Sequence, residues 1–154
     1  MATLARDIMT NKIMMIPVGQ SLADAMDLMT EKRIRHLPVV DVDSRIVGIL
    51  SLKDFSNVED LENQKVEVYM SKPIEWVDHD IPLRSAIMRM LEKKISALLV
   101  ADQKHELVGI VTTDDLLWLL AQSLEKSDEK HSLSTILDIE SLDEIAHQIA
   151  QTGI

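Results

Sequence analysis

Two short segments of the chain place a hydroxyl residue three positions before a carboxylate, directly after an apolar run. In GILSLKDF the pair is Ser51 and Asp54, and in GIVTTDDL it is Thr112 and Asp115. A carboxylate can accept two hydrogen bonds from a vicinal diol without help from a metal ion. A strand that runs into a helix presents free backbone N–H groups that suit a phosphate. The two segments are therefore candidate ligand sites.

The same spacing also approximates a capping box, the local motif in which a Ser or Thr and an acidic residue begin a helix. Asp stands here where Glu is commoner, and a capping box needs no ligand. Both interpretations remain open from the sequence, because one residue pair can begin a helix and also face a ligand.

The two segments belong to a duplication of the chain. Sliding the sequence on itself by 61 positions aligns the two halves without an insertion between residues 9 and 55. The aligned pairs include Met9 and Met70, Leu22 and Leu83, Met29 and Met90, Leu37 and Leu98, Gly48 and Gly109, and Asp54 and Asp115. A single repeat of this length predicts two small domains rather than a solenoid. We assign residues 1–60 to the first repeat and 66–124 to the second.

Each repeat has the same order of predicted elements, β-α-β-β-α. Apolar residues at three- and four-residue spacing predict helices from Leu22 to Met29, capped by Ser21, and from Leu83 to Met90. The predicted strands cover residues 13–18, 37–40 and 46–50, and then 74–77, 97–101 and 107–111. The last strand of each repeat is expected to enter a helix at Ser51 or Thr112. The fold class is α/β (α+β), with the repeats packed face to face around a pseudo-two-fold cleft.

Residues 125–154 follow the second repeat and read as a polar linker and an amphipathic C-terminal helix. Ser141 and Glu144 form a good capping box, and Leu142, Ile145 and Ile149 form an apolar stripe. So short a helix is marginal alone. We expect it to dock on its own module, on a second subunit or on a protein partner.

The composition excludes several classes of function. The chain of 154 residues has no Cys, which excludes disulfides, thiolate metal sites and a cysteine nucleophile. Its net charge of −10 would repel a nucleic-acid backbone. No apolar run is long enough to cross a bilayer, and no secretory signal is visible, so we expect a cytoplasmic protein without a membrane partner. The five His form no spaced metal motif.

The repeated unit resembles the cystathionine β-synthase (CBS) domain, and two in series resemble a Bateman module. The resemblance rests on G-h-x-[S/T]-x-x-D at both junctions, Gly48 to Asp54 and Gly109 to Asp115. It is supported by the opening motifs DIMT at residues 7–10 and YMSKP at residues 69–73, and by RHLPVV at residues 35–40. The resemblance covers residues 4 to 121.

The resemblance implies a regulatory ligand-binding module rather than an enzyme, with no required cofactor. Members of the family bind adenosine-containing ligands such as AMP, ADP, ATP or S-adenosylmethionine between the two repeats. The motif Asp holds the ribose hydroxyls, and the Ser or Thr contacts ribose or phosphate. The implied first site comprises Ser51, Asp54, Ile13, Met14, His36, Leu37 and Pro38, and the second comprises Thr112, Asp115, Ile74, Trp76, Ala97, Leu98 and Leu99.

Three positions near these sites carry further expectations. Lys53 beside the first pair could meet a phosphate, whereas its aligned counterpart Asp114 would repel one. Trp76 either stacks on adenine or packs in the core, and we favour the core. His36 either lines the site or is a histidine at the edge of the core.

The resemblance also implies a homodimer that associates through exposed helices. Residues 116–120, LLWLL, are apolar on more than one helical face and need cover. The alternative function is a dimeric protein-interaction scaffold whose clefts bind no ligand.

Overall fold

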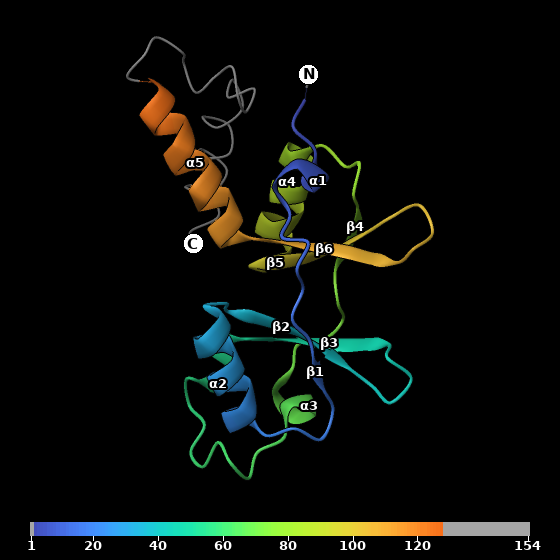
Figure 1. The fold of residues 1–154 in the computed structure, drawn as a ribbon, viewed down its shortest axis with the longest axis vertical. Coiled ribbons are helices and arrows are strands. Elements are labelled where there is room, and N and C mark those ends of the chain that lie inside the picture. The colour runs from blue at the N-terminus through green and yellow to red at the C-terminus, as the bar shows by residue number, and fades with distance from the viewer. Residues whose placement is uncertain (1, 128–154) are drawn as a thin grey trace. The chain divides into compact units, whose positions relative to one another are not determined.

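The computed structural model describes residues 2–127, which fall into two compact units. One unit is Asn11–Trp76, and the other combines residues 2–10 with residues 77–127. The C-terminal helix predicted from Leu142 onward lies outside the described residues. Each unit contains one three-stranded sheet with helices, which agrees with the predicted mixed architecture (Figure 1).

The unit Asn11–Trp76 is built on a sheet with the strand order β1-β2-β3. Its elements are β1 (Ile16–Pro17), α2 (Leu22–Lys32), β2 (His36–Val40), β3 (Ile46–Ser51), the 3-10 turn η1 (Leu52–Phe55) and α3 (Val66–Tyr69). β1 runs parallel to β2, and β3 runs antiparallel to β2. Both α2 and α3 lie on the same side of this sheet (Figure 1).

The second unit repeats this plan with the strand order β4-β5-β6. Its elements are α1 (Ala5–Ile8), β4 (Trp76–Asp78), α4 (Leu83–Lys93), β5 (Ala97–Ala101), β6 (Leu107–Thr112) and α5 (Thr113–Ser127). β5 and β6 pair antiparallel, with a register shift after Val100 that matches the shift after Val39 in the first unit. α5 extends three residues into the segment predicted as a linker.

Local sequence signals explain where the long helices and the hairpin turns lie. Ser21 caps α2 through a reciprocal pair of bonds with Asp24. α2 and α4 both end at a residue in the left-handed conformation, Arg33 and Lys94.

In the turn between β5 and β6, the carboxylate of Asp102 accepts hydrogen bonds from the backbone N–H groups of Lys104 and Glu106. These bonds lower the pKa of Asp102, and the bond from Glu106 contributes most.

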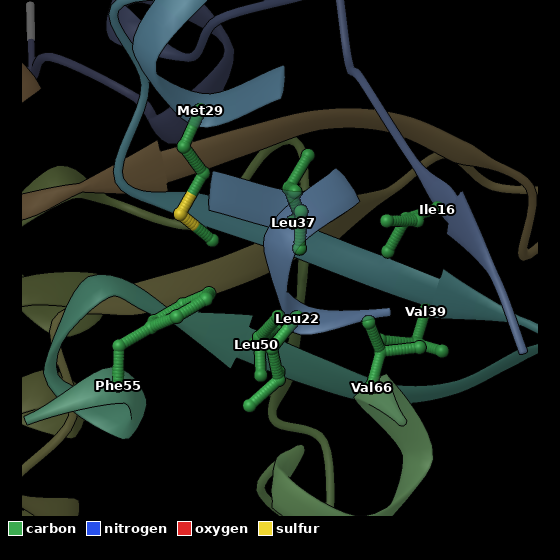
Figure 2. Close-up of a cluster of buried hydrophobic side chains, with 9 residues drawn as sticks. Ile16, Leu22, Met29, Leu37, Val39, Leu50, Phe55 and Val66 are labelled. Atoms are coloured by element: carbon green, nitrogen blue, oxygen red, sulfur yellow. The ribbon is translucent and has the colours of Figure 1, made fainter. Parts of the chain in front are cut away.

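Each unit has its own apolar core on the helix side of its sheet. In the unit Asn11–Trp76, side chains from α2, β2, β3 and α3 meet in one cluster (Figure 2). Its buried members are Ile16, Leu22, Ala25, Met29, Leu37, Val39, Leu50, Phe55 and Val66. The aligned residues Ala86, Met90, Leu98, Val100 and Val111 form the second core together with Ala5 and Val77. The predicted helix and strand faces supply both cores.

The opening segment of each repeat lies in the compact unit of the other repeat. Residues 2–10 bond to the second repeat, where Thr10 and Ile110 exchange two backbone hydrogen bonds of 2.9 and 3.1 Å. The aligned Ser71 exchanges two bonds of 2.8 and 3.3 Å with Ile49 in the first repeat. The short helices α1 and α3 within these segments were not predicted, because four residues are too few to show a periodicity.

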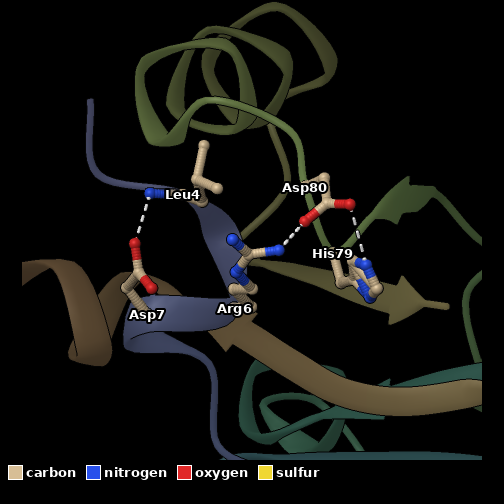
Figure 3. A network of polar contacts seen from close by, with 5 residues as sticks. All are labelled: Leu4, Arg6, Asp7, His79 and Asp80. Atoms are coloured by element: carbon tan, nitrogen blue, oxygen red, sulfur yellow. Dashed lines mark hydrogen bonds and ion pairs between the residues drawn. The ribbon is translucent and has the colours of Figure 1, made fainter. Parts of the chain in front are cut away.

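The two opening segments are anchored at the same position by different chemistry. Arg6 on α1 forms an ion pair with Asp80, which also contacts Nε2 of His79 at 3.0 Å (Figure 3). The aligned residue on α3 is Glu67, whose carboxylate accepts a bond of 2.9 Å from the backbone N–H of Gly19. That bond is the main cause that lowers the pKa of Glu67.

Where the sequence predicts a helix after Ser51, the structure has a short 3-10 turn. Only the 3-10 turn Leu52–Phe55 forms there, whereas the aligned segment begins the 15-residue helix α5. The sequence after Phe55 is SNVED, which contains turn-forming residues, and Asp60 adopts a positive φ of 60°. The aligned residues after Leu116 are LWLLAQ, which favour a helix.

Candidate functional site

The first candidate site is the junction between β3 and η1. Ser51 is the last residue of β3 and is buried, and Asp54 is half-buried in the turn that follows. Oδ2 of Asp54 accepts one bond of 2.7 Å from the backbone N–H of Ser51 and another of 2.8 Å from its hydroxyl. The carboxylate is therefore held in a fixed orientation against the end of the strand.

The second candidate site has the same geometry at the junction between β6 and α5. Oδ2 of Asp115 accepts bonds of 2.7 Å from both the backbone N–H and the hydroxyl of Thr112. The backbone N–H of Asp115 donates to Oγ1 of Thr112 at 3.4 Å, which completes a reciprocal cap. The capping interpretation thus describes both pairs, and each carboxylate still has a second oxygen with which to meet a ligand.

The opening segment supplies a further donor to Asp115. The hydroxyl of Thr10, from the opening segment, donates to Oδ1 of Asp115 at 3.2 Å. At Asp54, the two bonds from the backbone N–H and the hydroxyl of Ser51 both go to Oδ2. Thr10 was not predicted as a site residue. The signal that could have found it is its alignment with Ser71, since both hydroxyls follow the methionine of the opening motif.

The structure places His36 and its neighbours beside the first pair. His36 is the direct ladder partner of Ser51 and is 9% exposed, and Leu37 and Pro38 follow it as buried residues. Both interpretations of His36, at the edge of the core and lining the site, fit this place. Lys53 is an exposed residue of η1.

The remaining residues of the implied first site lie in the segment before β1. Met14 is half-buried and packs against the core cluster that contains Leu37. Ile13 is half-buried in the same unit. Their contact with a ligand stays a prediction.

At the second site the structure brings the β5 residues next to the Thr112–Asp115 pair. Ala97 is the ladder partner of Thr112, and Leu98 and Leu99 are buried next to it on β5. Trp76 is the first residue of β4, in the same sheet as β5, whereas Ile74 lies before that strand. The contact of either residue with a ligand stays a prediction. Trp76 is half-buried, and the choice between stacking on adenine and packing in the core stays a prediction.

The chemistry offered at each junction is hydrogen bonding by a fixed carboxylate beside a buried strand. Within the described residues, no group of three or more His, Asp or Glu side chains is arranged to hold a metal ion. No helix in the same part of the chain is long and apolar enough to span a membrane.

Comparison with known proteins identifies the repeated unit. A family model for the CBS domain matches residues 5–60 and again residues 65–122. Homoserine O-acetyltransferase of Methanohalobium evestigatum is 36% identical over 120 residues, which are 78% of this chain and 24% of that protein. The chain therefore spans about a quarter of the length of this relative.

Two solved structures resemble the chain in fold and carry adenosyl ligands. One is a CBS domain pair in complex with 5′-methylthioadenosine and S-adenosyl-L-methionine, with a TM-score of 0.72 and 26% identity over 80% of this chain and 99% of that one. The other is the CBS domain of a bacterial CNNM/CorC family Mg²⁺ transporter in complex with ATP. Its TM-score is 0.66 at 26% identity, over 75% of this chain and 84% of that one.

Proposed function

The chain belongs to the CBS domain family, and from that premise we propose that it is a regulatory module that binds an adenosine-containing ligand. The predicted resemblance to a tandem CBS pair and the predicted α/β (α+β) fold class are both confirmed. The proposed ligand sites are the Ser51–Asp54 and Thr112–Asp115 junctions, and AMP, ADP, ATP and S-adenosylmethionine are the candidate ligands.

The observation that carries this proposal is the repeated, fixed carboxylate. Both Asp54 and Asp115 use Oδ2 for their own junction, with two donors each. This leaves Oδ1 directed by the local structure rather than by a flexible side chain. A carboxylate held in this way can accept hydrogen bonds from the two hydroxyls of a ribose, and little side-chain entropy is lost when it does so. Two structural neighbours are complexes with adenosyl ligands, which supports the same chemistry here.

We propose a regulatory role rather than a catalytic one. The match to homoserine O-acetyltransferase covers 24% of that protein, so its name is no argument for acetyl transfer by this chain. In the proposed function, ligand occupancy changes the conformation of the module, and a protein partner responds to the change.

A thermal-shift screen tests ligand binding on the full chain. The panel is AMP, ADP, ATP, S-adenosylmethionine and NAD. A ligand that binds only the folded state raises the melting temperature. At a free ligand concentration of 100 times Kd, the folded state is stabilised by about 2.7 kcal/mol. A rise with at least one adenosyl ligand, and none with a pyrimidine nucleoside control, supports the proposal. No shift at millimolar concentrations of any of them would contradict it.

The second candidate function is a protein-interaction scaffold that binds no ligand. The observation in its favour is that capping by itself explains why each junction has a Ser or Thr paired with an Asp. The same thermal-shift screen separates the two, because the scaffold predicts no ligand effect.

We also propose that the chain is a homodimer that associates through α5. Leu117 and Trp118 are 63% and 68% exposed, and Leu124 is 48% exposed. Large apolar side chains that lie together on one helix gain free energy when a second copy covers them.

Sedimentation velocity is expected to give a dimer for the wild type at tens of micromolar. Trp118→Glu should shift the chain to monomer, because a charge is costly in a buried interface. The control is Gln122→Glu, which adds the same charge to an exposed polar position of the same helix. A monomeric wild type, or a Trp118→Glu variant that stays dimeric, would refute the prediction.

A further inference from the structure

One side of α5 carries a stripe of exposed leucines. Leu117, Leu120 and Leu124 are 63%, 37% and 48% exposed, although Leu116 of the same helix packs against the core of its own unit. Because successive helical residues are about 100° apart, these three leucines lie on one side of the helix, and Trp118 lies at least about 100° away from each of them. We call Leu117, Leu120 and Leu124 the leucine stripe.

The other exposed large apolar side chains do not form such a stripe. Within residues 2–127 they are scattered over different helices, turns and loops, namely Met15, Val42, Leu52, Val68 and Leu91. Single exposed apolar side chains are normal on a protein surface. Three of them at positions i, i+3 and i+7 of one helix are the pattern of a helix that packs against a neighbour on that side.

The end of the chain carries apolar side chains at the same spacing. Leu142, Ile145 and Ile149 also stand at i, i+3 and i+7, within residues 142–150, which we call the tail segment. The tail segment lies outside the described residues, and its pattern comes from the sequence alone. Two helices with such stripes can pack side by side in an antiparallel pair joined by a connecting segment.

The described structure ends close to the leucine stripe. α5 ends at Ser127, less than one helical turn after Leu124. Residues 128–141 connect α5 to the tail segment and can span about 45 Å when extended, whereas two packed helices are about 8–10 Å apart. A short connection gives the attached segment an effective concentration in the millimolar range. The chain's own tail segment is therefore favoured over a separate molecule at micromolar concentration.

We infer that the tail segment packs antiparallel along the leucine stripe of the same chain, with Leu142 next to Leu124 and Ile149 next to Leu117. This goes beyond the proposed function, because it needs no ligand. In the proposed dimer, the second copy would then meet Trp118 and the docked tail segment rather than the bare leucines. A protein partner that binds the leucine stripe would have to displace the tail segment first.

A pair of introduced cysteines tests this packing, because the full chain has no Cys of its own. Ala121 and Ala146 each stand four residues after the first residue of their stripe, which brings them together when the two helices run antiparallel. The test variant is Ala121→Cys with Ala146→Cys. The control variant is Gln122→Cys with Ala146→Cys, because Gln122 is exposed and lies at least about 140° from each leucine of the stripe.

Both variants are oxidised as full chains at low micromolar concentration and analysed on non-reducing gels. We expect the test pair to form a disulfide within one chain at least about tenfold faster than the control pair, since a disulfide needs Cα atoms within about 7 Å. Adding Ile145→Asp to the test pair should lower its rate to that of the control, because a charge is costly against leucines. Adding His147→Asp, on the opposite side of the tail segment from its apolar residues, should change the rate less than about twofold.

Hydrogen exchange on the unmodified chain gives a second measurement that needs no variant. The amides of residues 145–150 should exchange at least about tenfold more slowly than those of an unstructured peptide. Exchange at the rate of an unstructured peptide would overturn the inference.

Two outcomes of the cysteine experiment would also overturn the inference. Disulfides of the test pair that join two chains would show that the tail segment of a second copy covers the leucine stripe. Equal rates for the test and control pairs, or no effect of Ile145→Asp, would show that the tail segment does not pack there. Either outcome leaves the proposed ligand binding unaffected. Circular dichroism spectra that match wild type exclude unfolding of the variants as the cause.

Discussion

Asp54→Ala and Asp115→Ala are each expected to weaken adenosine-ligand binding at their own site by about ten- to 150-fold, which corresponds to about 1.5–3 kcal/mol for a lost charged hydrogen-bond partner. The other site should retain its affinity. Each variant removes the oxygen that would bond to the ribose and also the cap bonds that Oδ2 accepts from the preceding Ser or Thr, so the loss of affinity is compared with a variant that removes a cap alone. Calorimetric titration of each variant with ATP and S-adenosylmethionine measures both sites.

The chain supplies a matched control for the capping role of these residues. Asp24 makes the same three bonds with Ser21 at the start of α2, where the sequence predicts no ligand site. Asp24→Ala should therefore cost about 1 kcal/mol of stability, as the loss of a cap does, and leave ligand binding unchanged. If Asp24→Ala weakens binding as much as Asp54→Ala, or if the double variant of Asp54 and Asp115 binds like wild type, the ribose role is wrong.

Gly48→Ala is expected to destabilise the unit Asn11–Trp76 by about 1–3 kcal/mol, as overpacking does. A Cβ at Gly48 would lie 2.2 Å from Sδ of Met70, 2.6 Å from its Cγ and 3.0 Å from its Cβ. Since the clash extends to the base of the Met70 side chain, a rotation of the thioether end cannot relieve it. Urea denaturation followed by circular dichroism measures the decrease in the free energy of unfolding.

A double-mutant cycle identifies the cause of that loss. If the clash with Met70 is responsible, Gly48→Ala combined with Met70→Ala should cost less than the two single changes added together, with a coupling of about 1 kcal/mol. Gly109→Ala and Met9→Ala repeat the cycle in the other unit, where the corresponding Cβ would lie 2.3 Å from Sδ of Met9. Additive effects in both units would show that the glycines are needed for another reason.

The elements with strong apolar periodicity were predictable from the sequence. α2 and α4 bury Leu22, Met29, Leu83 and Met90, the residues whose spacing predicted both helices. β5 occupies the predicted residues, because a short run of buried apolar residues bounded by polar turns fits a core strand.

The features that depend on tertiary contacts were not predictable in the same way. β1 covers only Ile16–Pro17 of the predicted stretch 13–18, since its extent is set by pairing with Val39 and Val40 of β2. The exchange of opening segments between units rests on hydrogen bonds between residues far apart in the sequence, such as those of Thr10 with Ile110. Periodicity carries no information about such pairings.

The candidate site was predictable to a similar degree. The junction pairs followed from their repeated spacing, and the ladder positions of His36 and Ala97 follow from the register of the hairpins. The bond from Thr10 to Asp115 was missed because it joins residues 105 positions apart.

Residue-resolved NMR can show whether the two Ser/Thr–Asp junctions bind adenosyl ligands. Amide spectra of the full, ¹⁵N-labelled chain are recorded during titration with ATP and with 5′-methylthioadenosine. We expect saturable shifts at the amides of Ser51 and Asp54 and at those of Thr112 and Asp115, because these N–H groups belong to the proposed sites. Saturable shifts elsewhere with these four amides unmoved, or no shifts with either ligand, would show that the junctions do not bind these ligands.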